Sequence, residues 1–210
     1  MICISIPENN IETCLQLIET ADMAEIRIDM AQFDELAVRT VFSKSTKPLI
    51  ATCRPELVLD AKRIKLLKVA IESGAAYVDI EIESSIEFKQ DIISHAKKND
   101  CKIIISYHNY ENTPSSNELH AIIDSCFDSG AHIAKIATTA QSTSDSARIL
   151  GLYSHYNSLV ALAMGEKGKI TRVANISLGS PFTFAAISDD KKTAPGQLTV
   201  AEMKQFNGLL

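Results

Sequence analysis

The run Ile133-Ala134-Lys135-Ile136-Ala137 decides how this chain is interpreted, because it places a charged amine inside an apolar stretch. Such an unbroken apolar run is typical of a strand buried on both faces, as in a parallel sheet. Burial disfavours a charged ammonium, and the neutral amine is the nucleophile that attacks ketones to form a Schiff base. Lys135 is therefore either a catalytic nucleophile or a strand-end lysine whose amine reaches solvent or a carboxylate.

Outward from this run, β-rich segments alternate with segments of helical period along the whole chain. Strands are expected at residues 2–6, 25–29, 49–53, 77–82, 102–107, 133–137, 159–164 and 182–186. Helices are expected at residues 11–21, 61–73, 87–98, 117–129 and 142–154, with weaker patterns in the seventh and eighth connections. The order is that of repeated β/α units.

Eight β/α units in series favour a closed parallel (β/α)8 TIM barrel. Each parallel connection needs a crossover helix, and eight such units close without leaving a sheet edge. The sequence therefore predicts one barrel domain over residues 1–210, with short loops, because a typical barrel has roughly 250 residues. A doubly wound open sheet is the alternative, and it is disfavoured because no G-x-G-x-x-G or P-loop follows any strand.

Composition narrows the class of partner. With 46% hydrophobic and 22% charged residues, the chain has the composition of a globular domain, and its net charge of -5 argues against nucleic acid and anionic membranes. The one basic cluster is interpreted as a solvated helix face and comprises Lys62, Arg63, Lys65 and Lys68. Five cysteines without a C-x-x-C pair, and no leader or apolar run of roughly 18 residues, predict a cytoplasmic protein with reduced thiols. A small-molecule substrate is the expected partner.

Polar and ionisable residues recur near the carboxyl ends of the expected strands. They are Glu25, Arg27 and Asp29 on one face of the second strand, Arg54 after the third, Asp79 and Glu81 on the fourth, Ser106 and His108 on the fifth, and Lys135 on the sixth. A barrel interior is normally filled by branched apolar side chains, and helices cover the outside. We therefore expect these groups to converge on a functional pocket.

Residue type suggests roles within such a pocket. Histidine accepts and donates protons near neutral pH, so His108 is a candidate proton carrier, although it could instead cap the following loop. Arginine binds carboxylates and hydroxyls through its forked N–H groups. Asp79, Glu81 and His108 resemble metal ligands, but a metal would add positive charge beside Lys135 and the arginines. These residues therefore require no metal.

Eight ordered fragments together resemble the type I 3-dehydroquinate dehydratases of the shikimate pathway. They are A-E-I-R-I-D at 24–29, I-A-T-C-R at 50–54, Y-V-D-I-E at 77–81, I-S-Y-H-N at 105–109, A-K-I-A at 134–137, A-M-G-E-K-G-K-I-T-R at 163–172, G-S-P-F-T-F-A at 179–185 and T-A-P-G-Q-L at 193–198. The resemblance implies a (β/α)8 lyase that converts 3-dehydroquinate to 3-dehydroshikimate through an imine, without a cofactor. Members of the family are commonly homodimers.

The resemblance also implies a role for each matching residue. Lys135 would form the Schiff base, and His108 would act as the general acid and base. Binding roles fall to Glu25, Arg27 and Arg54 for the ring hydroxyls, to Arg172 and Gln197 for the carboxylate, to Thr193 where a serine often binds the same carboxylate, and to Met164 in the pocket wall. Gly165 and Gly168 would flank a loop over the substrate, or simply form ordinary turns. Met164 could equally be core filler.

Two departures from the family pattern are visible. Val58 stands where a glutamate or glutamine is expected to orient the histidine, so Glu56, Glu81 or another acid would have to replace it, or the rate would be lower. The first strand begins at residue 2, so the N-terminal hairpin of many members is expected to be absent. The alternatives to a dehydratase are another lysine-imine lyase, such as a class I aldolase, and a barrel that binds a quinate-like ligand with impaired catalysis.

Overall fold

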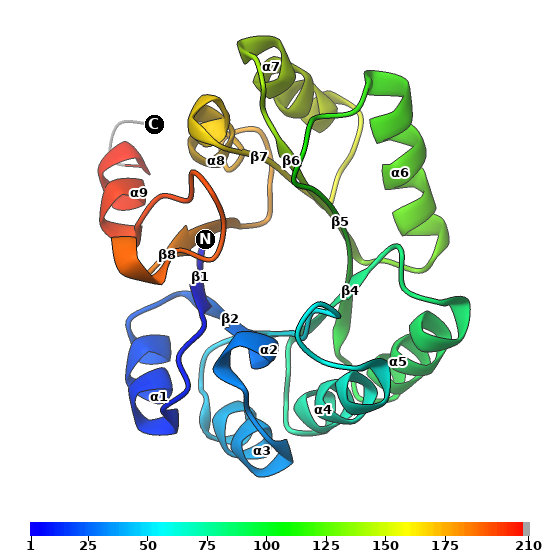
Figure 1. Ribbon diagram of the computed structural model, residues 1–210, viewed down its shortest axis with the longest axis vertical. Helices are drawn as coiled ribbons and strands as arrows, with labels where there is room; N and C mark the ends of the chain where they lie inside the picture. Colours follow the sequence, from blue (N-terminus) through cyan, green and yellow to red (C-terminus); the bar gives the residue numbers. More distant parts are fainter. Residues whose placement is uncertain (208–210) are drawn as a thin grey trace. The chain divides into compact units, whose positions relative to one another are not determined.

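The computed structural model describes residues 1–207, in which eight parallel strands alternate with helices (Figure 1). The strands are β1 (Ile2–Ile6), β2 (Met23–Arg27), β3 (Leu49–Thr52), β4 (Tyr77–Glu81), β5 (Lys102–Asn109), β6 (Ile133–Thr139), β7 (Leu159–Met164) and β8 (Thr183–Ala186). Their order across the sheet is β7-β6-β5-β4-β3-β2-β1-β8. This is the topology of a (β/α)8 barrel, and the predicted fold class is confirmed.

The helices follow the strands in the expected alternation. The α-helices are α1 (Ile11–Glu19), α2 (Ile28–Ala31), α3 (Glu35–Lys44), α4 (Asp60–Glu72), α5 (Ile86–Lys98), α6 (Ser116–Asp128), α7 (Thr143–Gly151), α8 (Lys169–Ala174) and α9 (Val200–Asn207). Three short 3-10 segments complete the order: η1 (Leu152–Ser154), η2 (Glu166–Gly168) and η3 (Asp189–Lys191).

Most expected elements are found within a few residues of their predicted bounds. The sequence analysis assigned no helix to residues 30–48, although α3 has an N-cap at Asp34 and buries Ala37, Val38, Val41 and Phe42 at helical spacing. The expectation that Asp29 lies on the second strand is wrong, because β2 ends at Arg27 and Asp29 belongs to the short helix α2. The ion pair between Arg27 and Asp29 accompanies this early end of the strand.

Two compact units can be distinguished by their internal contacts. The amino-terminal unit comprises Cys3–Ile104, and the carboxy-terminal unit comprises Met1–Ile2 together with the chain from Ile105 onward. In the amino-terminal unit the strands pair in parallel register, with Glu25 opposite Ser5 and Ile50, and helix α4 packs between α3 and α5. The predicted single domain over residues 1–210 stays a prediction, and its residues 208–210 lie outside the described part.

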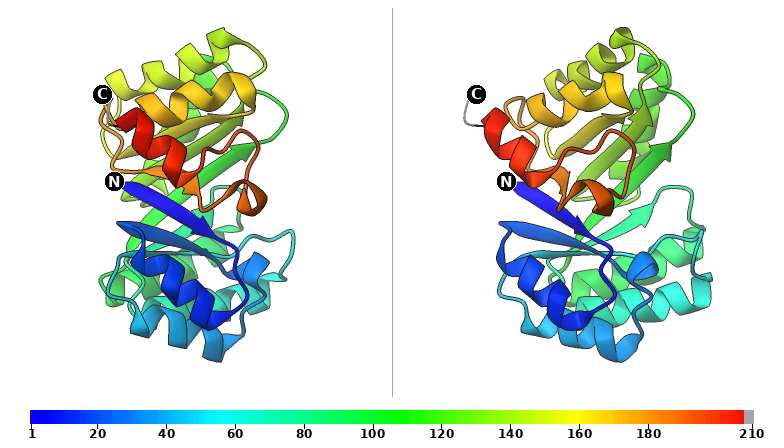
Figure 2. Two further views of the ribbon diagram at one scale, coloured as in Figure 1. Left: turned by 90° about the vertical axis from the view of Figure 1, so that its left-hand side faces the viewer. Right: turned by 60° about the vertical axis from the view of Figure 1, so that its left-hand side comes forward.

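The carboxy-terminal unit has its own apolar cluster, formed by Ile2, Val173, Ala185, Leu198 and Met203. The Thr183 N–H donates to the carbonyl of Met1 at 3.1 Å, which starts β8 beside the first residues of the chain. Both views of Figure 2 show α9 lying close to β8, with which it is in contact. Strands β6 and β7 pair along six consecutive residue pairs, from Ala134 with Leu159 to Thr139 with Met164.

Local sequence signals set the boundaries of the elements that carry the predicted site residues. Helices α6 and α7 both begin with a capping box, Ser115 with Glu118 and Ser142 with Asp145, which satisfies backbone N–H groups at the helix start. Helix α4 is followed by Gly74, whose φ of 100° lies in the left-handed region that glycine adopts without a steric penalty. The turn leads directly into β4.

Within residues 1–207, no helix combines the length and the apolar character needed to cross a bilayer. All five cysteines are buried free thiols, as the sequence analysis expected. Burial raises the pKa of the Cys53 thiol to about 12, and nearby Asp29 adds to the effect. The thiol is therefore a packing group at neutral pH.

Candidate functional site

In the amino-terminal unit, Glu25 is held on β2 by hydroxyls from the two neighbouring strands. Its Oε2 accepts from Ser5 Oγ at 2.7 Å and its Oε1 accepts from Thr52 Oγ1 at 2.9 Å. All three side chains are buried. The hydroxyls fix the plane of the carboxylate, so Glu25 keeps one orientation.

Arg27 and Arg54 stand at or just after the ends of β2 and β3. Arg27 binds both carboxylate oxygens of Asp29, at 3.1 and 2.6 Å. Arg54 donates through Nη2 to Asp79 Oδ2 at 3.0 Å and through Nη1 to Glu81 Oε1. Burial alone would lower the pKa of Arg54, but the Asp79 and Glu81 carboxylates outweigh it and the pKa is raised. Arg54 therefore stays a cation in a buried position.

The interpretation of the basic cluster as a solvated helix face is wrong for Arg63. Lys62 and Lys65 are exposed, but the Arg63 side chain is only 2% exposed. Its Nη2 donates to Glu81 Oε2 at 2.5 Å, its Nε donates to the Cys53 carbonyl at 2.8 Å, and its guanidinium lies 4.5 Å from the centroid of the Phe88 ring. Arg63 thus belongs to the same charged cluster as Arg54.

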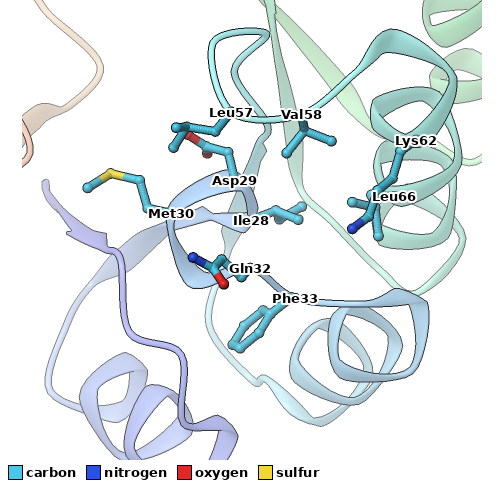
Figure 3. A pocket seen from close by; sticks show the side chains of 9 residues that line it. All are labelled: Ile28, Asp29, Met30, Gln32, Phe33, Leu57, Val58, Lys62 and Leu66. Atoms are coloured by element: carbon cyan, nitrogen blue, oxygen red, sulfur yellow. The ribbon is translucent and has the colours of Figure 1, made fainter.

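A pocket of about 380 Å³ lies within the amino-terminal unit, lined by residues of α2, of the connection between β3 and α4, and of α4. Val58 projects into it from the connection between β3 and α4, toward Ile28, and Phe33 and Leu66 form further apolar walls (Figure 3). Glu56, in the same connection, is exposed. The position where the family resemblance leads one to expect an acidic or amide side chain is therefore used for apolar contact.

In the carboxy-terminal unit, Lys135 occupies the middle of β6, opposite Val160 of β7. The residue is only 5% exposed, and its Nζ lies 4.2 Å from the centroid of the Phe184 ring on β8. Phe184 in turn packs edge-on against Phe182, with ring centroids 5.5 Å apart. The amine thus lies over an aromatic ring that is itself supported by a second one. The expectation of a buried strand lysine is confirmed, and Met164 is likewise buried, at the end of β7.

His108 is half-buried near the end of β5, where the following turn is tied to β6. Asn109 Oδ1 accepts the N–H groups of Glu111 and Asn112 at 2.9 Å each, which closes the turn. Thr139 Oγ1 donates to the Asn109 carbonyl at 3.2 Å. The ends of the strands that carry His108 and Lys135 are therefore fixed to each other within this unit.

Arg172 is a buried cation of a different kind. It is 1% exposed, and among residues 1–207 its Nε and Nη2 atoms have no hydrogen-bond partner. Burial lowers the pKa of Arg172 to about 10. Thr183 Oγ1 donates to its backbone carbonyl at 3.0 Å and anchors the residue. A guanidinium with unused N–H groups suits a carboxylate or phosphate ligand.

Thr193 and Gln197 form one hydrogen-bonded turn. The buried Gln197 Oε1 accepts from the Thr193 N–H at 2.8 Å and from Thr193 Oγ1 at 3.2 Å, which orients the amide group. The turn is pressed against the residue after β7: a Cβ at Gly196, where φ is 70°, would lie 2.5 Å from the Gly165 carbonyl oxygen. Gly168 is similarly close to the Ala163 carbonyl oxygen, at 2.3 Å from a built Cβ. Both glycines are therefore required by close backbone approach.

The predicted site residues fall into both units. Glu25, Arg27 and Arg54 lie in the amino-terminal unit; the carboxy-terminal unit holds Lys135, His108, Met164, Arg172, Thr193 and Gln197. Sequence reasoning missed two residues: Phe184, which contacts Lys135, and Arg63, which binds Glu81 and the carbonyl of the residue before Arg54. Phe184 lies within a quoted family fragment and shares a strand face with Phe182, which is a signal that could have found it. Arg63 had no such signal, because lysines surround it on the same helix.

Comparison with known proteins gives consistent results over the whole chain. A model of the type I 3-dehydroquinase family matches residues 2–210. A 3-dehydroquinate dehydratase of Methanococcus maripaludis is 34% identical over 221 residues, covering all of both chains. One from Methanocaldococcus jannaschii is 35% identical over 222 residues, covering 98% of this chain and 97% of the relative. The crystal structure of the 3-dehydroquinate dehydratase from Aquifex aeolicus is 28% identical, with a TM-score of 0.84, and the match covers 100% of this chain and 98% of that one.

Proposed function

Because the chain belongs to the type I 3-dehydroquinase family, we propose that it dehydrates 3-dehydroquinate to 3-dehydroshikimate through a Schiff base on Lys135. The observation that carries the proposal is the buried amine of Lys135 on β6, with its Nζ above the Phe184 ring. A lysine in the interior of a strand is costly to the fold, and imine chemistry gives that placement a use.

The reaction assigned to these residues balances without a metal or a redox cofactor. Lys135 Nζ adds to the substrate ketone, and loss of water gives an imine that withdraws electrons from the adjacent carbon. His108 removes a proton from that carbon and then protonates the departing hydroxyl, which leaves as water. Hydrolysis of the imine releases the product and restores the amine. The tie between the ends of β5 and β6 supports the pairing of His108 with Lys135.

Binding roles follow the charges of the described residues. Arg172, whose buried Nε and Nη2 atoms have no partner among residues 1–207, is assigned the substrate carboxylate, with the oriented amide of Gln197 and the hydroxyl of Thr193 beside it in the proposed complex. Glu25, Arg27 and Arg54 are assigned the ring hydroxyls, and Met164 a wall. Carboxylates and guanidiniums held rigidly by neighbouring groups are suited to such hydroxyls.

We further propose that residues 1–210 form one catalytic domain, that the protein is a cytoplasmic homodimer, and that the reaction needs no cofactor. Two other functions remain as outcomes of its test. A class I aldolase would share Lys135 but has no need of the set formed by Arg54, Arg172 and Gln197. A quinate-like ligand binder with impaired catalysis is favoured only by Val58, an apolar residue in the pocket wall where the family pattern has an acid or amide.

The test combines trapping with turnover. The protein is incubated with 3-dehydroquinate and borohydride, the modified peptide is located by mass spectrometry, and enone formation is followed by ultraviolet absorbance. We expect a reduced adduct on Lys135 and turnover in the wild type, neither in Lys135→Ala, and an adduct with stalled turnover in His108→Ala. Lys97→Ala, at an exposed helix position, is the matched control and should behave as wild type.

Each other outcome contradicts a defined part of the proposal. A missing adduct on Lys135 excludes the Schiff base. An adduct without product identifies the impaired binder, and full turnover by His108→Ala removes the histidine from the proton transfer. Turnover of an aldol substrate but not of 3-dehydroquinate would select the aldolase.

A further inference from the structure

Arg63 connects helix α4 to the group of residues that surrounds Arg54. It lies near the start of α4 (Asp60–Glu72), where its Nη1 donates to Asp60 Oδ1 at 2.6 Å. Asp60 is largely exposed, so solvent weakens this pair. The contacts that matter are therefore the buried ones, which Arg63 makes with Glu81 and with the Cys53 carbonyl.

These two contacts hold Arg54 at two separate points. The Cys53 carbonyl belongs to the residue immediately before Arg54, and Arg63 Nε fixes it at 2.8 Å. Glu81 lies between the two arginines: one carboxylate oxygen accepts from Arg63 and the other from Arg54. Arg63 thus constrains both the backbone that carries Arg54 and the carboxylate that orients its guanidinium.

We propose that Arg63 is a positioning residue for substrate binding, which acts on Arg54 through Glu81 and the Cys53 carbonyl. In the group formed by Arg54, Arg63, Asp79 and Glu81, two cations balance two anions. Without Arg63, the contact that Glu81 Oε2 keeps among residues 1–207 is the 3.4 Å one from Ser84 Oγ, and Arg54 becomes the one arginine of this group. Arg54 would then be drawn toward the carboxylates and away from a ligand hydroxyl.

The connection between β3 and α4 explains why a helix residue takes this role. Val58 points into the pocket toward Ile28 (Figure 3), whereas Glu56 is exposed. The link from α4 back to the end of β3 is made by the long, forked side chain of Arg63, which reaches three acceptors at once. Lysine carries its three N–H donors on a single nitrogen, so it cannot reproduce contacts that Arg63 makes separately from Nε, Nη1 and Nη2.

This inference rests on the proposed dehydratase activity, because its readout is the KM for 3-dehydroquinate. The variants are Arg63→Lys, Arg63→Met, Glu81→Gln and the double variant Arg63→Lys with Glu81→Gln, assayed well below their unfolding midpoints. Lys65→Met, at an exposed position of the same helix, is the matched control. We expect KM to rise about 5-fold in Arg63→Lys and about 30-fold in Arg63→Met, with kcat within about 2-fold of wild type.

Two further observations separate positioning from a general structural role. If Arg63 acts through Glu81, the effects of Arg63→Lys and Glu81→Gln on KM are less than multiplicative in the double variant. A merely structural role predicts a loss of active enzyme, seen as lower kcat, at unchanged KM. Should Arg63→Met fail to fold, Arg63→Lys and the double variant decide the question.

The outcomes also distinguish this inference from its premise. If the wild type shows neither turnover nor a trapped Lys135 adduct, both the proposed function and the positioning role of Arg63 are contradicted. A wild type with normal turnover, whose Arg63 variants fold and keep KM within about 2-fold, overturns the positioning role alone. A raised KM in Lys65→Met equal to that of Arg63→Lys would overturn it as well.

Discussion

Arg63 in the amino-terminal unit and Arg172 in the carboxy-terminal unit are equally buried but differently satisfied. Arg63 donates to two carboxylates and a backbone carbonyl and stacks on Phe88. Arg172 has two nitrogens without a hydrogen-bond partner among residues 1–207, and burial lowers its pKa to about 10. Arg63 is compensated by the fold itself, whereas the described residues leave N–H groups of Arg172 for a ligand to use.

The difference shows how burial alone fails to identify a functional charge. Transfer of a charged group from water into a protein costs several kcal/mol unless partners compensate for the lost hydration. Where the chain supplies those partners, as around Arg63, the charge orders its neighbours. Where residues 1–207 leave N–H groups without partners, as at Arg172, the buried charge destabilises the fold but is available to bind an anionic ligand.

Replacing each arginine with methionine tests this comparison through stability and gives the largest expected effect. Arg63→Met should lower the free energy of unfolding by about 3–5 kcal/mol, because the buried carboxylate of Glu81 loses the arginine that pairs with its Oε2. Arg172→Met should leave stability unchanged or raise it by about 1 kcal/mol, because it removes an uncompensated charge. Urea unfolding followed by circular dichroism measures both.

Lys65→Met is the control for this pair and should change the free energy of unfolding by less than about 0.5 kcal/mol, as is usual for an exposed position. An equal loss of stability in the two arginine variants would break the comparison. It would mean that Arg172 is compensated in the fold as fully as Arg63.

Substrate binding gives a second test of the difference between Arg63 and Arg172. Arg172→Gln should raise the KM for 3-dehydroquinate about 100-fold, equivalent to about 2.7 kcal/mol, because a charge-assisted contact to the substrate carboxylate is lost. An analogue that lacks the carboxylate should bind the variant and the wild type equally. Steady-state kinetics and competition by the analogue provide the measurement. A KM within about 3-fold of wild type would show that the carboxylate is bound elsewhere.

Much of the fold could be predicted because each strand is a short apolar run bounded by polar residues. Residues 2–6 and 159–164 were expected as strands and form β1 and β7 over those same bounds. Helix α3 was overlooked even though Asp34 and the spacing of Val38 and Phe42 indicate it. Helix α2 is harder to foresee, since it has four residues, too few to show a period.

For the candidate site, the sequence identified candidate residues more readily than the neighbours that contact them. The burial of Lys135 follows from the apolar residues beside it on β6. The burial of Arg63 depends on Glu81 from β4 and Phe88 from α5, which no local pattern brings together with it. The unsatisfied state of Arg172 depends equally on neighbours distant in sequence. The partners of a buried charge come from elements that are distant in sequence, so they are known only once the tertiary structure is known.

The smallest predicted effect concerns Thr193, which orients Gln197 in the unit that contains Arg172. Thr193→Val should raise the KM about 3-fold, because the backbone N–H at 2.8 Å still holds Gln197 Oε1 after the 3.2 Å hydroxyl contact is lost. Thr193→Ser keeps the hydroxyl and should match wild type. A KM in Thr193→Val as high as in Arg172→Gln would contradict this ranking, because it would give the hydroxyl the weight assigned to the buried guanidinium.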